Sequence, residues 1–317
     1  DPENGEEVWT FDPKIDKHRR FGNMMINRGM AYWKEDNSND ESRVFIGTLD
    51  ARLIAVSVKS GHPIKDFGEN GTVNLLKDVD HLTDPWEYNI TSPPTIVGDL
   101  VIIGSSIADI VRRIQPSGVV RAYDVRTGKL AWRFNTIPQD DEPGTETWGN
   151  ESWRIHGGAN VWSTITADLI RNIVFLPVST AGPDLYGGDR PGANLYSDAV
   201  VAFDAFTGKM VWYFQTVHHD LWDYDLAAPP VLVTVKHNNK MVDAIAVATK
   251  TAFVFLLNRE TGEPLFPVEE RKVPLSDVPG ERSWPTQPFP VKPPPLMNQS
   301  FDEQDIWAKD SSHYKAC

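Results

Sequence analysis

Short runs of alternating apolar and polar positions occur along much of the chain, and polar turns separate them. In residues 200–214 (VVAFDAFTGKMVWYF), an apolar run leads into a polar turn with Gly208, and a second run follows that carries aromatic side chains. A period of two residues is typical of β-strands, and glycine takes the positive φ that a tight turn requires. The pattern predicts a β-hairpin. Helical periodicity is scarce and Gly and Pro interrupt most runs, so we predict an all-β fold.

The same hairpin pattern recurs along the chain. Residues 122–134 (AYDVRTGKLAWRF) and 202–214 (AFDAFTGKMVWYF) are near copies, weaker copies occupy residues 1–9 and 258–266, and residues 55–67 keep the glycine without the tryptophan. The five turn glycines are 54 to 80 residues apart, which leaves room for a propeller blade of about 40–50 residues and an insertion. A tryptophan at a constant offset suits docking between neighbouring sheets, with its indole N–H on a backbone carbonyl. The repeats therefore predict a β-propeller.

The composition excludes some classes of binding partner but says little about the cellular compartment. The chain has 317 residues, a formal net charge of -13 and a pI near 5.0, which argues against nucleic acid and anionic membranes as partners because an acidic surface repels polyanions. Its single cysteine, Cys317, allows no intrachain disulfide. No apolar run approaches the roughly 18 residues that span a bilayer, and no signal peptide opens the chain. We interpret the chain as a fragment. The loss of a signal peptide or of a membrane anchor would be compatible with this interpretation.

Four segments between the repeats carry more specific information. They are residues 27–33 (NRGMAYW), 91–106 (TSPPTIVGDLVIIGSS), 157–163 (GGANVWS) and 214–225 (FQTVHHDLWDYD). Together with the hairpins they resemble the PQQ-dependent (quinoprotein) dehydrogenases over nearly the whole chain, and the last segment is most similar to the membrane-type glucose dehydrogenase branch. The resemblance implies an eight-bladed β-propeller with tryptophan-docking motifs. Residues 1–317 would then be a partial propeller domain of about five blades, incomplete at both ends.

The resemblance also implies a reaction. Members of the family use tightly bound PQQ and a divalent metal, so we expect PQQ-dependent oxidation of an aldose or polyol hydroxyl. Calcium is the metal we expect, and a lanthanide is the alternative. The electrons would pass to a membrane quinone or a cytochrome c. A periplasmic location follows from the same resemblance, with any membrane anchor lying outside this chain.

Asp223 is the strongest candidate for catalysis. Asp220, Asp223 and Asp225 are crowded among aromatic residues in HHDLWDYD, and acids placed in this way shift one another's pKa unless a cation is present. Asp223 falls where the family has its general base, which takes the proton from the substrate hydroxyl. The alternative for this segment is a turn capped by aspartate side chains.

Five residues match cofactor contacts of the family. Lys250, inside the apolar run AVATKTAF, aligns with the cation that hydrogen-bonds the quinone carbonyls, and Arg28 aligns with an arginine that meets the cofactor's oxygens. Both cations suit a quinone that bears carboxylates. Trp162 falls where the family stacks a tryptophan under the ring system, and Thr91 and Ser106 are weaker candidates. The structural alternatives are a strand-end lysine, a surface ion pair and a core tryptophan.

The expected metal ligands are acidic. Asp109 in GSSIAD lies at the position of the family's acidic ligand, and we expect Asp223 and Asp225 to contribute, with further oxygens supplied by the quinone. One departure is Gly182 in STAGPD, because the alcohol dehydrogenases have an asparagine ligand there. Asp225 is the residue that could compensate.

The sequence combines features of the glucose-type and alcohol-type branches of the family, so it does not assign the substrate to one of them. Gly22 and Asn23 stand where alcohol-type members have two adjacent cysteines, which favours the glucose type, whereas Trp33 resembles the alcohol type. A primary-alcohol dehydrogenase is therefore the first alternative. The second is a non-catalytic propeller scaffold of the same repeat family, which would have no reason to keep the site residues together. His218 and His219 invite a zinc site, but adjacent residues on a strand point to opposite faces.

Overall fold

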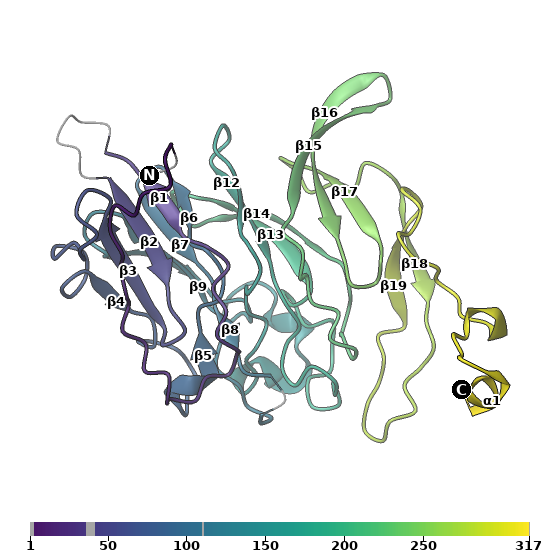
Figure 1. Ribbon diagram of the computed structural model, residues 1–317. Coiled ribbons are helices and arrows are strands. Elements are labelled where there is room, and N and C mark those ends of the chain that lie inside the picture. Colours follow the sequence, from purple (N-terminus) through teal and green to yellow (C-terminus); the bar gives the residue numbers. More distant parts are fainter. Residues whose placement is uncertain (1–2, 36–41, 110, 317) are drawn as a thin grey trace.

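Three four-stranded sheets and one three-stranded sheet follow one another along the chain (Figure 1). The computed structural model describes residues 3–35, 42–109 and 111–316, so Asp1 and Cys317 lie outside these ranges. The first sheet contains β1 (Ala31–Trp33), β2 (Arg43–Gly47), β3 (Arg52–Ser57) and β4 (Thr72–Asn74). The second contains β6 (Thr95–Val97), β7 (Leu100–Ile103), β9 (Val120–Asp124) and β10 (Leu130–Phe134). The third contains β11 (Thr166–Asp168), β12 (Ile173–Pro177), β13 (Ala199–Asp204) and β14 (Met210–Gln215). The fourth contains β15 (Val231–His237), β16 (Lys240–Ala248) and β17 (Val254–Asn258).

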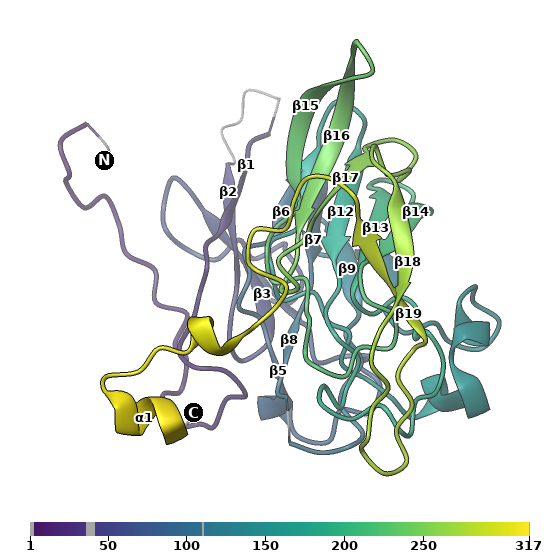
Figure 2. The same ribbon diagram turned by 90° about the vertical axis from the view of Figure 1, so that its right-hand side faces the viewer.

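Shorter elements surround these sheets. Two strand pairs are β5 (Tyr88–Asn89) with β8 (Ser106–Ile107), and β18 (Val268–Lys272) with β19 (Thr286–Pro290). The helical turns are η1 (Pro85–Glu87), η2 (Thr145–Thr147), η3 (Gly149–Arg154) and η4 (Glu303–Asp305), and α1 (Ser311–Ala316) lies away from the sheets in Figure 2. Among the described residues, we find no helix with the length and apolar character needed to cross a membrane.

The repeated turn forms because one aspartate organises it. The Asp204 carboxylate accepts hydrogen bonds from the N–H and the hydroxyl of Thr207, each at 2.8 Å, and its carbonyl accepts one from the Gly208 N–H at 3.0 Å. Gly208 has a φ of +65°. Asp124 and Gly128 form the same turn. β13 pairs with β14 around one turn and β9 with β10 around the other, so the hairpins predicted for residues 122–134 and 202–214 are confirmed.

The first strands of successive sheets face one another. β1 contacts β6, β6 contacts β11, and β11 contacts β15. Side chains tie these edges together, because the Thr95 hydroxyl donates to the Ile165 carbonyl at 3.0 Å and the Thr166 hydroxyl to the Pro230 carbonyl at 2.6 Å. Sheets joined through their first strands are the arrangement of propeller blades, and the predicted all-β propeller architecture is supported.

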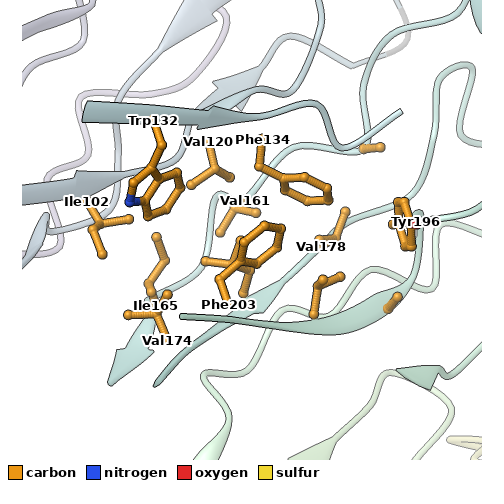
Figure 3. Packing of buried hydrophobic residues seen from close by; sticks show 14 of the residues in the cluster. Ile102, Val120, Trp132, Phe134, Val161, Ile165, Val174, Val178, Tyr196 and Phe203 are labelled. Atoms are coloured by element: carbon orange, nitrogen blue, oxygen red, sulfur yellow. The ribbon is translucent and has the colours of Figure 1, made fainter. Parts of the chain in front are cut away.

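Aromatic side chains fill the seam between the second and third sheets (Figure 3). Trp132 lies nearly parallel to Phe203, with ring centroids 6.0 Å apart, and Phe134 lies 4.6 Å from Phe203 and 5.7 Å from Tyr196. All four side chains are buried. Removal of such large apolar surfaces from water is the main force that holds neighbouring sheets together.

Three tryptophans each lie against the glycine of another hairpin turn. A Cβ added to that glycine would lie less than 3.0 Å from the indole ring, so only glycine admits the contact. The indole N–H donates to a carbonyl of the same turn. The pairs are Trp9 with Gly61 and the Val58 carbonyl, Trp132 with Gly208 and the Ala205 carbonyl, and Trp212 with Gly262 and the Arg259 carbonyl.

The five hairpin signatures do not each form a sheet. The described part of residues 1–9 contains no strand and supplies Trp9 to the turn of the first sheet. The remaining four signatures mark the four sheets, and the β18–β19 hairpin follows them. We therefore see four sheets where five signatures were counted, and the number of blades in the whole ring stays a prediction.

Candidate functional site

Five of the predicted site residues lie in segments that lead into the first strand of a sheet, whereas Ser106, Asp109 and Lys250 lie elsewhere. Arg28 precedes β1, Thr91 precedes β6, Trp162 precedes β11, and Asp223 and Asp225 precede β15. Because these first strands face one another, the segments before them meet at one end of the sheets. This explains why four short motifs far apart in the sequence can build a single site.

Hydrogen bonds join three of these segments directly. The Arg28 N–H donates to the Thr91 carbonyl at 3.0 Å, and the Ser92 hydroxyl donates to the Trp162 carbonyl. The Arg28 guanidinium also lies 5.2 Å from the centre of the Trp162 ring, within the range of a cation–π interaction. The structure therefore brings Arg28 and Trp162 together, as their shared role at a cofactor would require.

Lys250 bridges the two acids of the fourth segment. Its Nζ lies 3.1 Å from Asp223 Oδ2 and 3.4 Å from Asp225 Oδ2, and it donates to the Asp223 carbonyl at 2.8 Å. Lys250 occupies the turn between β16 and β17. The indole N–H of Trp162 donates to the same Asp225 Oδ2 at 3.0 Å. Four of the predicted residues thus form one connected group.

The electrostatics of this group suit proton transfer. Burial, and then repulsion from Asp225, raises the pKa of the Asp223 carboxyl, while Lys250 opposes the rise. Burial lowers the pKa of Lys250, but the charges of Asp225 and Asp223 outweigh it and raise that pKa overall. Lys250 is therefore a stable cation beside an acid that takes up a proton more readily than an ordinary aspartate.

Two further acids adjoin the group. Asp109 keeps an exposed edge, yet the protein around it displaces enough water to raise the pKa of its carboxyl to about 7, and the charges of Asp225 and Asp223 contribute to the rise. Asp184 is buried, and burial followed by repulsion from Asp109 raises its pKa to about 8. Sequence reasoning missed Asp184. It lies two residues after Gly182 in STAGPD, and neither a repeat nor a resemblance marked it.

The acids do not form a ready-made metal site. Within the part of the chain that the structure describes, no three or more His, Cys, Asp or Glu side chains are arranged to hold a metal ion. Both oxygens of Asp225 already accept hydrogen bonds, Oδ1 from the Thr180 N–H at 2.7 Å and Oδ2 from Trp162. Asp109 and Asp184 are crowded acids that a cation would stabilise. Metal binding by Asp109, Asp223 and Asp225 therefore stays a prediction.

Two buried hydroxyl groups in these segments lack a hydrogen-bond partner. The Thr91 hydroxyl is buried and has no partner, and so is the Ser105 hydroxyl, although buried polar groups are normally hydrogen-bonded. The Arg28 N–H donates a hydrogen bond to the Thr91 carbonyl. The side-chain amide of Asn160, which lies two residues before Trp162, donates to the Ser105 carbonyl at 3.0 Å. The Thr91 and Ser105 hydroxyls are the groups here that still lack a partner, and a cofactor contact of Thr91 stays a prediction.

Ser106 is engaged elsewhere. Its hydroxyl donates to Asn23 Oδ1 at 3.2 Å, and Asn23 in turn donates to Asn89 Oδ1 at 3.0 Å. The pairing of β5 with β8 places Asn89 opposite Ser106. Ser106 therefore links the segment of Asn23 to the β5–β8 pair, and a direct cofactor contact stays a prediction.

The two histidines belong to separate environments. His218 Nδ1 lies 2.7 Å from Gln215 Oε1 and its Nε2 lies 3.2 Å from Glu270 Oε1, whereas His219 is buried with Nδ1 2.8 Å from Asn194 Oδ1. The sequence argument placed both histidines on a strand, and that premise is wrong. Both follow β14 in a loop and not in a strand, and His219 has a φ of +47°.

An apolar cavity of about 620 Å³ lies beside the acidic loop. Trp222 and Tyr224, which flank Asp223 in the sequence, line it together with Phe253, Trp284 and Phe289. Its size is in the range of small-molecule sites.

Comparison with known proteins agrees with the geometry. A family model described as "PQQ: Glucose/ethanol/alcohol dehydrogenase, beta-propeller domain" matches residues 1–317. The chain is 40% identical over 273 residues to the quinate/shikimate dehydrogenase (quinone) of Acinetobacter baylyi, covering 86% of this chain and 33% of that protein. It is 37% identical over 313 residues to quinoprotein glucose dehydrogenase A of Acinetobacter calcoaceticus, covering 91% and 38%.

A solved structure shows the same architecture. The quinohemoprotein alcohol dehydrogenase from Comamonas testosteroni matches with a TM-score of 0.71 and 28% sequence identity, over 91% of this chain and 42% of that chain. The chain thus spans from 33% to 42% of the length of these three relatives.

Proposed function

The chain belongs to the PQQ family of glucose/ethanol/alcohol dehydrogenase β-propeller domains, and we propose that it supplies the base and most of the cofactor floor of a quinoprotein dehydrogenase. The observation that carries this proposal is the connected group of Arg28, Trp162, Asp223 and Lys250, which Asp225 joins together. A non-catalytic scaffold of the same repeats needs the hairpins and their tryptophans. It has no need for a lysine that pairs with two aspartates, or for the indole ring and the guanidinium next to them.

Asp223 is the proposed general base. Its raised pKa favours uptake of the proton that leaves the substrate hydroxyl, and Lys250 holds the carboxylate in place through the 3.1 Å ion pair. Asp225, fixed by Thr180 and Trp162, lies next to Asp223, and its repulsion contributes to the raised pKa of Asp223.

Arg28, Thr91, Trp162 and Lys250 are the residues that would hold PQQ. Trp162 offers a flat apolar face, Thr91 an unpaired hydroxyl, and the two cations offer donors for carboxylate and carbonyl oxygens. When bound, PQQ would supply the acceptor for the hydride that the substrate carbon loses, and a bound metal ion would polarise the accepting carbonyl. Asp109, Asp184 and Asp223 are the acids that would reach such a metal, for which we propose calcium, with a lanthanide as the alternative.

We propose an aldose or polyol as substrate. The relatives named above include a glucose dehydrogenase and a quinate/shikimate dehydrogenase. Trp33, which favoured a primary alcohol from the sequence, is buried and lies 4.8 Å from the Arg126 guanidinium and 5.7 Å from that of Arg43. A tryptophan packed in this way carries no information about the substrate. Electron transfer to a membrane quinone or a cytochrome c in the periplasm completes the proposal.

Reconstitution tests this function. The full-length protein, incubated with PQQ and calcium, should take up PQQ and oxidise aldoses or polyols with an artificial dye as acceptor. A panel of aldoses, polyols and primary alcohols separates the two substrate classes. No uptake of PQQ at micromolar concentrations, with metal in excess, would contradict the proposal.

A further inference from the structure

A cluster of charged side chains lies buried beside the acidic loop. Arg190 and Asp198 have no exposed surface, and Asp220 is 1% exposed. Thr180, also buried, connects the two acids, because its Oγ1 lies 2.9 Å from Asp198 Oδ1 and 2.5 Å from Asp220 Oδ2, and Arg190 donates to the Asp220 carbonyl. The role proposed above for Asp223 does not use this cluster.

The hydroxyl of Thr180 fixes the number of protons in the cluster. A hydroxyl group has a single hydrogen, so it can donate to only one of the two carboxyl groups at a time. The contact with the other carboxyl group is a hydrogen bond only if that group is protonated and donates to Thr180 Oγ1. Two ionised carboxylates on one hydroxyl would leave two anionic oxygens facing each other across a buried oxygen, which is strongly unfavourable.

The charges around the cluster also indicate that one of the two carboxyl groups carries a proton. Arg190 is a cation, since a guanidinium keeps its proton in proteins even where burial lowers its pKa. Its neighbour His219 is neutral, because burial, together with the charge of Arg190, lowers the pKa of its ring to about 4. Asp189 forms an ion pair with Arg113 outside the cluster. Arg190 brings one positive charge to the cluster, so two ionised acids beside Thr180 would leave a buried negative charge unbalanced, in agreement with the count from the hydroxyl.

The hydrogen bonds show which acid is ionised. Asp220 also accepts from the Trp222 N–H at 2.9 Å and from the Tyr224 N–H at 2.5 Å, and backbone donors stabilise a carboxylate. Asp198 Oδ2, by contrast, has no partner. An unpaired buried oxygen is far less costly on a neutral acid than on an anion. The proton therefore belongs to Asp198.

We propose that Asp198 is a neutral carboxylic acid that donates to Thr180, that Thr180 donates to Asp220, and that this chain of hydrogen bonds positions Asp225. The link to the site is the Thr180 N–H, which donates to Asp225 Oδ1 at 2.7 Å. Thr180 and Asp198 are thus positioning residues, and their effect on turnover rests on the function proposed above. The protonation of Asp198 does not depend on that function.

Infrared spectroscopy tests the protonation directly. At neutral pH, the spectrum of the full-length protein minus that of Asp198→Asn should contain the carbonyl band of a protonated carboxyl group, shifted in heavy water. Asn is neutral and can donate to Thr180 in the same direction, so this variant should also keep its melting temperature. A difference spectrum with carboxylate bands in place of the acid band would overturn the proposal, whether or not the protein binds PQQ.

Substitution of Thr180 tests the positioning role. Thr180→Val removes the hydroxyl and keeps the shape, whereas Thr180→Ser keeps the hydroxyl. With PQQ and calcium bound, the valine variant should lose about tenfold or more in kcat with little change in KM, because a small misplacement of a charged group next to the base slows the chemical step, and the serine variant should recover most of it. Equal kcat values for the two variants would contradict the role. Failure of the unsubstituted protein to bind PQQ would instead contradict the proposed function.

Discussion

Two acids of the site, Asp109 and Asp184, release their protons at a higher pH than an ordinary aspartate. The pKa of Asp109 is raised to about 7 and that of Asp184 to about 8, in both cases first by burial and then by repulsion from other acids of the group. At pH values between the ordinary 3.8 and these raised values, the folded protein holds protons that the unfolded chain has released. The free energy of unfolding of the metal-free protein should therefore fall as the pH rises through this window.

Urea unfolding of the full-length, metal-free protein at about pH 5 and about pH 8 measures this slope. Calcium should restore more stability at the higher pH, because metal ligands must be ionised. The variant with Asp109→Asn and Asp184→Asn should show a flatter dependence on pH and a smaller response to calcium. An unchanged slope in that variant would show that other groups cause the effect.

Sequence reasoning found the site residues that a motif marks and missed those that only the fold brings near. Asp223, Lys250, Arg28 and Trp162 lie in recognisable segments, and the structure joins them. Asp184 lies outside these motifs and reaches the group through the folding of the chain. Residues of this kind carry no local signal, because neither their spacing nor their residue type differs from that of ordinary turn acids.

At the scale of elements, the contact between a tryptophan and a glycine turn is open to a matched test. Gly208 and Gly5 both have positive φ, at +65° and +75°, but a Cβ on Gly208 would lie 2.4 Å from Trp132 Cγ, whereas a Cβ on Gly5 would meet nothing within 4 Å. Gly208→Ala should lower the free energy of unfolding by about 2–4 kcal/mol, from backbone strain plus overpacking. Gly5→Ala should lower it by about 1 kcal/mol, from strain alone.

Chemical denaturation of the two variants gives the comparison. Similar losses would show that the conformation of the glycine matters and that the packed indole does not.

The hairpins could be predicted because their information is local. Asp204, Thr207 and Gly208 form a turn within a few residues, and the strands on either side alternate visibly. The β5–β8 pair and the contacts between first strands depend on residues far apart in the chain, and no local pattern marks them. The weak copy at residues 1–9 shows the opposite error, since the motif was present but no strand formed in its described part.

At the scale of the whole molecule, the sheets and the site depend on each other. Each sheet contributes one segment to the site, and those segments meet because the first strands face one another. The sequence supported a propeller through its repeats and a quinoprotein through four segments between them. The number of blades and the substrate depend on packing and on loops over the site, which repeats and motifs do not encode.

The central claim is that Asp223 acts on the proton of the substrate and not in binding of the cofactor. Asp223→Asn removes the basic carboxylate and keeps an oxygen at the same place, and Asp66→Asn is a control at an exposed aspartate. Turnover and PQQ uptake are measured together in the full-length protein loaded with PQQ and calcium. We predict that Asp223→Asn takes up PQQ like the control and loses about 100-fold or more in kcat. Turnover close to that of the control would contradict the account.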